Sequence, residues 1–166
     1  MAEAIAQSPL TGSRDKIIAK AKELALKYRD SSYKEGGKDT VAFDCSYFVY
    51  LVMHEVFPIY AYANTSLIAA SPNFKESENG KPGDIIFFPK GQIPYAVKKG
   101  DKRVYPNHVG IVLDSTSWVG RQSSSLGIVL FSNPWWGSRA CEYYTYYKID
   151  SAEARANGSN LRMHFA

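Results

Sequence analysis

The chain has 166 residues, enough for one domain with a single core, and its 45% hydrophobic content argues against intrinsic disorder. The 20 Lys and Arg exceed the 16 Asp and Glu, giving a net charge of +4 that favours polyanionic surroundings. The basic residues form no long tract with interleaved aromatics, so nucleic-acid binding is not expected. The two cysteines and three histidines lack zinc-ligand spacing, which argues against a metal site.

The sequence carries no recognisable targeting segment. No window approaches 18 uninterrupted apolar residues, and the first 30 residues lack a basic start, an apolar stretch and a small-residue cleavage site. We therefore expect neither a membrane span nor an ordinary signal peptide. Residues 1–12 are predicted to be a flexible arm, 13–150 a single domain, and the weakly patterned residues 151–166 a tail.

Helical patterns come first along the chain. Apolar residues at helical spacing predict a helix that begins at Ser13, as N-cap, and ends near Arg29. After a turn-rich stretch, 31–40, a second apolar pattern predicts a helix that begins at Cys45 and is closed by Pro58. Residues 64–70 favour another short helix, and residues 71–83 are polar and rich in turn signals.

Strand patterns dominate the remainder. Five segments combine β-branched or aromatic residues with turn signals at their ends: 84–88, 108–113, 118–122, 127–132 and 143–149. The stretch between residues 89 and 107 is predicted to be a long loop. Helices followed by an antiparallel sheet of about five strands indicate an α+β fold.

Cys45 is the first candidate for chemistry. A helix N-terminus stabilises a thiolate through unpaired N–H groups and its positive dipole end, and the same N–H groups can receive an oxyanion. A free cysteine is, however, more often a buried packing residue. The flanking polar residues Asp44 and Ser46 favour the catalytic interpretation, because a core cysteine would prefer apolar neighbours.

His108 is the best placed of the three histidines to act as a base. It begins a predicted strand, which would hold an imidazole rigidly, and Gly110 two residues later leaves room for a ligand or another backbone. His54 lies inside the second predicted helix and His164 in the tail. A lone histidine can also be purely structural, and the pattern does not exclude this.

Several motifs occur in an order that resembles the NlpC family of papain-like cell-wall endopeptidases. They are a helix, Tyr-x-x-Gly-Gly at 33–37, Phe-Asp-Cys-Ser at 43–46, Asn-Thr-Ser at 64–66, Gly-Asp with a hydrophobic run at 83–88, and His-Val-Gly-Ile at 108–111. The resemblance covers about residues 14 to 132. Their conjunction in this order is far more specific than any single motif.

The resemblance implies a papain-like fold in which Cys45 is the nucleophile and His108 the general base. Asp44, Ser46 and Tyr33 are expected to hold the peptide substrate. The family typically cleaves the bond between γ-D-glutamate and a diamino acid in murein stem peptides. The reaction passes through a covalent acyl-enzyme and needs no cofactor.

The sequence departs from the family pattern at positions near the proposed site. Tyr47 stands where Gly usually follows Asp-Cys-Ser, and Glu35 replaces a frequent aromatic residue. The third polar residue, which orients the histidine, ordinarily lies about twelve positions beyond it, where this chain has Gly120. Gln122 is two residues further on the same strand face, so we predict it as the third catalytic residue. It could instead merely point into the cleft, and a backbone carbonyl could also orient the imidazole.

Two other functional classes remain open. The chain could be an inactive relative that binds wall fragments or a protein, in which case Gly120 and Tyr47 mark lost catalysis. It could also keep the nucleophile as an acyltransferase, or as a protease with a substrate other than murein. An aromatic cluster at 135–136 and 143–147 could line a substrate groove or form part of the core.

With no export signal and no separate wall-binding domain in view, we expect a toxin or effector, or a phage lysin. It would reach the periplasm or cell wall by a route independent of a signal peptide. An effector would need a cognate immunity protein as partner, because the producing cell must be protected. Cys141 receives no role, and we expect it to lie apart from Cys45, since a disulfide would abolish nucleophilicity.

Overall fold

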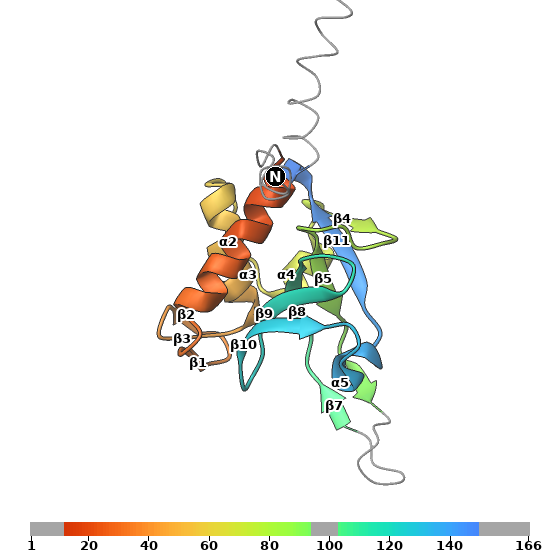
Figure 1. The fold of residues 1–166 in the computed structure, drawn as a ribbon. Coiled ribbons are helices and arrows are strands. Elements are labelled where there is room, and N and C mark those ends of the chain that lie inside the picture. The colour runs from red at the N-terminus through yellow and green to blue at the C-terminus, as the bar shows by residue number, and fades with distance from the viewer. Residues whose placement is uncertain (1–11, 94–102, 150–166) are drawn as a thin grey trace, which may run out of the picture.

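The computed structural model describes residues 12–93 and 103–149, and Figure 1 shows their arrangement. The first half contains α2 (Ser13–Lys27), β1 (Ser32–Tyr33), β2 (Lys38–Asp39), β3 (Ala42–Phe43), α3 (Cys45–Val56), α4 (Thr65–Ala70) and β4 (Phe74–Ser77). The second half contains β5 (Ile85–Phe88), β6 (Gly91–Ile93), β7 (Arg103–Tyr105), β8 (His108–Val112), β9 (Ser117–Arg121), β10 (Leu126–Leu130), α5 (Pro134–Gly137) and β11 (Glu142–Tyr146). The predicted arm and tail lie outside the described residues, apart from Gly12.

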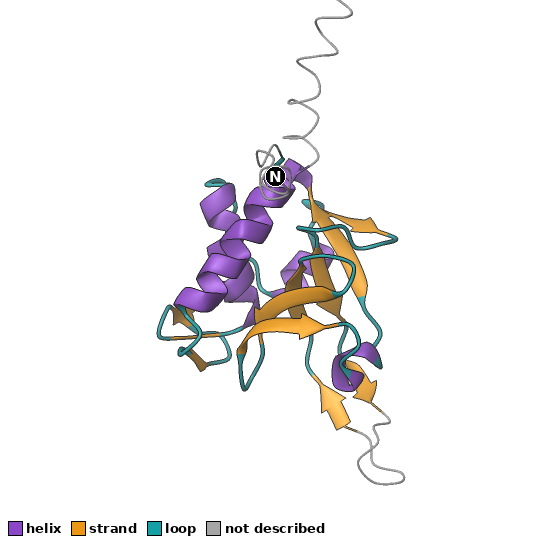
Figure 2. Cartoon of the chain, viewed as in Figure 1, coloured by secondary structure: helices purple, strands orange, loops and turns teal. Residues whose placement is uncertain are grey.

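The predicted α+β architecture is confirmed. Six strands form one sheet in the order β10-β9-β8-β5-β11-β4, and every neighbouring pair is antiparallel. In Figure 2 the helices α2 and α3 lie together beside the curved sheet. Helix α3 contacts β8 and β9, so the segment that begins at Cys45 lies next to the strand that begins at His108.

Two hydrophobic clusters cover the two faces of the sheet, because alternate strand residues point to opposite sides. The larger cluster joins the helices to one face, through residues such as Phe48, Val49 and Val109. The smaller cluster lies on the other face and contains Ile86, Phe88, Val112, Trp118 and Val129, with Trp135 and Trp136 packed against it.

The structure corrects three sequence predictions about the elements. Gly12, not Ser13, is the N-cap of α2, and the Ser13 hydroxyl is buried without a hydrogen-bond partner. Strand β4 lies in a segment predicted to be turns, so the sheet has six strands where about five were expected. The stretch predicted to be a long loop contains the paired strands β6 and β7.

Asp84 ties the first helix to the sheet. Its carboxylate is fully buried and accepts hydrogen bonds from Arg14 Nη1 at 2.9 Å, from Thr145 Oγ1 at 2.7 Å and from the backbone N–H of Lys81 at 2.9 Å. Gly83 precedes it with a φ of 92°, a left-handed conformation that favours glycine. The Gly-Asp motif therefore holds the N-terminus of α2 against β5 and β11.

We expect Asp84→Ala to lower the free energy of unfolding by about 3 to 5 kcal/mol, because it breaks a buried ion pair. It also removes the acceptor of the Thr145 and Lys81 hydrogen bonds. Urea unfolding followed by circular dichroism measures the change. Asp114→Ala is the matched control, because Asp114 also accepts several hydrogen bonds but is exposed in a turn. An equal loss in both variants would contradict the assigned role of burial.

Candidate active site

The start of α3 is fixed by Asp44. Its Oδ1 accepts the backbone N–H of Tyr47 at 3.0 Å, which caps the helix, and its Oδ2 accepts the backbone N–H of Gly36 at 2.9 Å. Gly36 has a φ of 73°, so glycine is favoured there. One carboxylate thus holds both the helix N-terminus and the 33–37 loop, and Cys45 is the first residue of the helix.

Ser46 completes this local network. Its hydroxyl donates to Asp44 Oδ1 at 3.1 Å and lies 3.0 Å from the hydroxyl of Tyr62, and the residue is only 1% exposed. Asp44 and Ser46 were both predicted to hold substrate. Their polar atoms bind one another and the backbone, although both residues line the cavity in front of Cys45.

The Cys45 sulfur is buried at the junction of three elements. It lies 3.9 Å from Thr65 Oγ1, at the start of α4, and close to the backbone N–H of Val109 in β8, which acts to lower its pKa. Burial raises the pKa of the Cys45 thiol and outweighs these contacts, which favour the thiolate. Burial therefore acts against the thiolate expected at the helix N-terminus.

His108 is held by the smaller cluster. Its ring stacks on Trp136 with centroids 4.9 Å apart, and its Nε2 lies 3.3 Å from Gln122 Oε1. Burial lowers the pKa of His108 to about 4, the Gln122 hydrogen bond acts against this shift, and the charge of Arg139 adds to it. The imidazole is therefore neutral at physiological pH. With Nε2 facing an amide oxygen, the proton belongs on Nε2 and the lone pair on Nδ1.

Strand register explains why Gln122 and not residue 120 meets the histidine. Ile111 pairs with Val119 and Val112 with Trp118, and the same register continued to the strand ends places Gln122 opposite His108. A turn two residues shorter would have placed residue 120 there. A Cβ on Gly120 would lie 2.9 Å from the Trp118 ring and 3.0 Å from Gln122 Oε1, so this glycine makes room for the amide.

Cys45 and His108 open into neighbouring cavities. The Cys45 cavity has a volume of about 560 Å³, and the His108 cavity about 300 Å³. Tyr33 and Pro106 line both, so the two cavities meet at these residues. Tyr33 is 37% exposed, and burial raises the pKa of its hydroxyl to about 12. Among the described residues there is no direct hydrogen bond between the Cys45 sulfur and the His108 ring.

Sequence reasoning assigned no role to several residues around these cavities. Thr65 belongs to a quoted motif, and its position directly after the N-cap Asn64 was the available signal. Arg139 lines the His108 cavity and lies 4.3 Å from the Trp136 ring centroid, which no local pattern indicates. Lys38 and Lys90 line the Cys45 cavity and carry positive charge to it.

The remaining candidates that the structure describes line neither the Cys45 cavity nor the His108 cavity. Tyr47 packs against the rings of Phe43, Tyr50 and Tyr62 and is not among the residues that line the Cys45 cavity. His54 stacks on Tyr50, and His164 lies outside the described residues. Cys45 and Cys141 are both free thiols, and Cys141 packs against the smaller cluster on the other face of the sheet.

The predicted aromatic cluster divides between the two faces of the sheet. Trp135 and Trp136 line the His108 cavity, whereas Tyr144 and Tyr146 belong to the larger hydrophobic cluster. Within residues 12–93 and 103–149, no helix has the length and apolar character needed to cross a membrane. The same residues contain no group of three or more His, Cys, Asp or Glu side chains arranged to hold a metal ion.

The chain is similar in sequence to a curated protein. The chain is 27% identical over 124 residues to the probable peptidoglycan endopeptidase LytE of Bacillus subtilis, covering 75% of this chain and 32% of that protein. It thus spans about a third of the length of this curated relative.

Two solved structures share the fold. The NlpC/p60 domain of the peptidoglycan hydrolase SagA superposes with a TM-score of 0.50 at 23% identity, over 78% of this chain and 96% of that one. An NlpC/P60 family protein from Bacillus cereus gives a TM-score of 0.55 at 21% identity, over 81% and 40%. The sequence model of the NlpC/P60 family matches residues 30–145, which include Cys45, His108 and Gln122. The chain belongs to the NlpC/P60 family.

Proposed function

We propose that the chain is a cysteine hydrolase that cleaves amide bonds in the stem peptides of bacterial murein. The observation that carries the proposal is that Cys45, at a helix N-terminus, packs beside the first residues of β8, where His108 pairs with Gln122. Similarity to proteins named as peptidoglycan endopeptidase and hydrolase supports the substrate class.

The first half-reaction forms an acyl-enzyme. Both groups are neutral in the free protein, so the Cys45 thiol attacks the carbonyl carbon as its proton passes to Nδ1 of His108. This transfer requires the ring and the sulfur to approach when substrate is bound, and such contacts commonly tighten in the substrate complex. The N–H of Cys45, at the first turn of α3, is positioned to receive the oxyanion.

The first half-reaction ends when the imidazolium gives its proton to the leaving amine as the C–N bond breaks, leaving a thioester on Cys45. The second half-reaction restores the enzyme: water attacks the thioester while His108 takes a proton from the water, and that proton returns to the departing sulfur. The Gln122 carbonyl oxygen accepts the Nε2–H throughout and holds the ring in one tautomer.

The charges around the Cys45 cavity suit a stem peptide. Lys38 and Lys90 can face the free carboxylates of the stem, and Glu35 can face the amine of a diamino acid. This arrangement supports cleavage between γ-D-glutamate and a diamino acid. Asp44 and Ser46 act in this proposal mainly by fixing the helix N-terminus, and Tyr33 contacts the substrate where the two cavities meet. The site of action would be the cell wall.

Digestion of purified murein followed by mass spectrometry tests the proposal. We expect new fragments that end in γ-D-glutamate, together with fragments that begin with the diamino acid. Glycan chains should keep their length, because amide and glycosidic bonds need different catalytic groups. Murein that the wild-type protein leaves unaltered would contradict the proposed function.

A further inference from the structure

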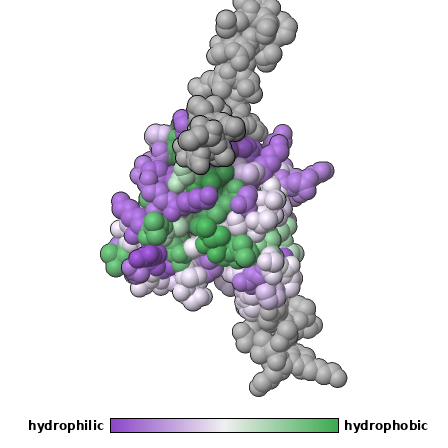
Figure 3. Space-filling view, viewed as in Figure 1, coloured by the Kyte–Doolittle hydropathy of each residue, from purple (hydrophilic) through white to green (hydrophobic). Residues whose placement is uncertain are grey.

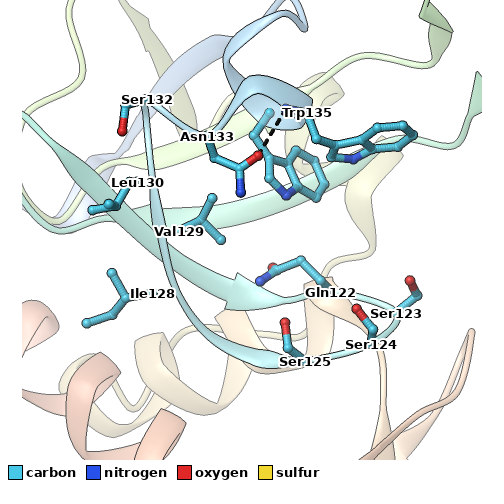
Figure 4. A pocket seen from close by; sticks show the side chains of 11 residues that line it. Gln122, Ser123, Ser124, Ser125, Ile128, Val129, Leu130, Ser132, Asn133 and Trp135 are labelled. Carbon is cyan, nitrogen blue, oxygen red and sulfur yellow. Dashed lines mark hydrogen bonds between the residues drawn. The ribbon is translucent and has the colours of Figure 1, made fainter. Parts of the chain in front are cut away.

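A third cavity extends the site beyond His108, along strand β10. It has a volume of about 790 Å³, within the range of ligand sites, and shares Gln122, Ser123, Trp135 and Trp136 with the His108 cavity. Figure 4 shows it between the 123–125 turn, β10 and the indoles. The proposed hydrolytic reaction assigns it no occupant.

The chemistry of the lining favours a neutral, hydroxylated ligand. None of the described residues around this cavity is charged; they supply serine hydroxyls, the amides of Gln122 and Asn133, indoles and aliphatic side chains. The free carboxylates and amine of a stem peptide would find no charge partner there. An indole offers a large apolar face beside a polar N–H, which suits a sugar ring with C–H faces and hydroxyls at its edge.

Gln122 gives a second, independent indication. The residue is only 7% exposed, its Oε1 faces His108, and its Nε2 is buried with no hydrogen-bond partner. In Figure 4 its amide end points into the cavity. A buried amide nitrogen without a partner costs about 1 to 3 kcal/mol, which a ligand oxygen can relieve. A sugar hydroxyl suits this position because it can both accept and donate.

We propose that this cavity binds an amino sugar of the murein glycan, the one that carries the stem peptide cleaved at Cys45. The inference rests on the proposed function and adds a sugar subsite to it. Two of the lining side chains are exposed apolar residues of β10, Ile128 at 58% and Leu130 at 53%. Green, apolar surface gathers near the middle of the face shown in Figure 3. Gln122 then links sugar binding to the orientation of the His108 ring.

The test compares two substrates that differ only in the sugar: an N-acetylmuramyl stem peptide and the same peptide without sugar. The quantity measured is the ratio of their kcat/KM values. We expect the wild-type ratio to exceed one, and Ser125→Tyr, which places a bulky ring in the cavity, to lower it about tenfold or more. Trp135→Leu, which removes an indole but keeps an apolar side chain, should lower the ratio in the same direction.

Ser115→Tyr is the matched control, because Ser115 is exposed in the β8–β9 turn outside the cavity. It should leave the ratio unchanged. Calorimetric binding of both ligands to Cys45→Ala should show the same preference for the sugar. A wild-type ratio of one, or an equal loss for both substrates in Ser125→Tyr, would overturn the sugar subsite while leaving the hydrolase intact. If neither substrate is cleaved but the sugar preference in binding persists, the proposed reaction fails and the subsite stands.

Discussion

Cys45→Ala is expected to lower the rate of murein hydrolysis by about 10⁴-fold or more, because losing a nucleophile removes the covalent pathway. The remaining groups can still bind substrate and stabilise an oxyanion, but without the sulfur no thioester forms. Fragment release from purified murein measures the effect. Stability should change little, since the substitution removes a single buried sulfur atom from the first turn of α3.

Cys141→Ala is the matched control for this prediction. Cys141 is the second free thiol, and it is in hydrogen-bond contact with the Tyr143 hydroxyl at 3.7 Å and does not line the cavities of Cys45 or His108. Activity should survive its replacement. Alkylation followed by peptide mapping should show that loss of activity tracks modification of Cys45. Equal activity in the wild type and Cys45→Ala would assign the chemistry to another group.

The same experiment separates the two remaining functional classes. If the chain is an inactive binding relative, both the wild type and Cys45→Ala would leave murein unaltered. An acyltransferase would yield new amide products when amine acceptors are added. Tyr47, one mark of lost catalysis in the sequence, packs with other aromatic rings away from the residues lining the cavity. Gly120, the other mark, leaves room for Gln122. Both departures are therefore compatible with catalysis.

The elements near the site were predictable because their signals are local. Asp44 at the N-cap, apolar residues such as Phe48 and Val52 at helical spacing, and Pro58 after the end define α3 without tertiary information. Strand β4 was not predicted because only Phe74 is buried and Lys75 and Glu76 are exposed, as suits an edge strand. Edge strands carry the weakest alternation, so the sequence resembled a turn.

The electrostatics of the site could not be predicted in the same way. A helix N-terminus favours a thiolate, but Cys45 is only 5% exposed and its burial has the larger effect on the pKa of the thiol. Trp136 and Arg139, which surround the His108 ring, come from a segment about thirty residues further along the chain. Burial and register are tertiary properties, whereas the sequence signals that located Cys45 and His108 are local.

His108→Phe is expected to lower kcat/KM at pH 7 by about 10² to 10⁴-fold, the usual contribution of general acid and base catalysis. Phenylalanine keeps a flat ring against Trp136, so the smaller cluster should remain packed. It leaves Gln122 Oε1 without its partner, and thermal unfolding measures that cost. Steady-state cleavage of a synthetic stem peptide across pH 4 to 10 measures the activity of both proteins.

The pH profiles distinguish a base from a packing residue. In the wild type the imidazole stays neutral until the pH falls towards its pKa of about 4, so the acid limb should lie well below the ordinary value of 6.5. In the variant the reaction needs the thiolate, whose fraction rises about tenfold per pH unit below the raised Cys45 pKa, so activity should climb with pH. For stability in acid, the order of the two proteins is reversed. The unfolded histidine binds a proton below about pH 6.5 and the folded one only near 4, so acid unfolds the wild type more readily than the variant. A variant profile parallel to that of the wild type would show that His108 only packs.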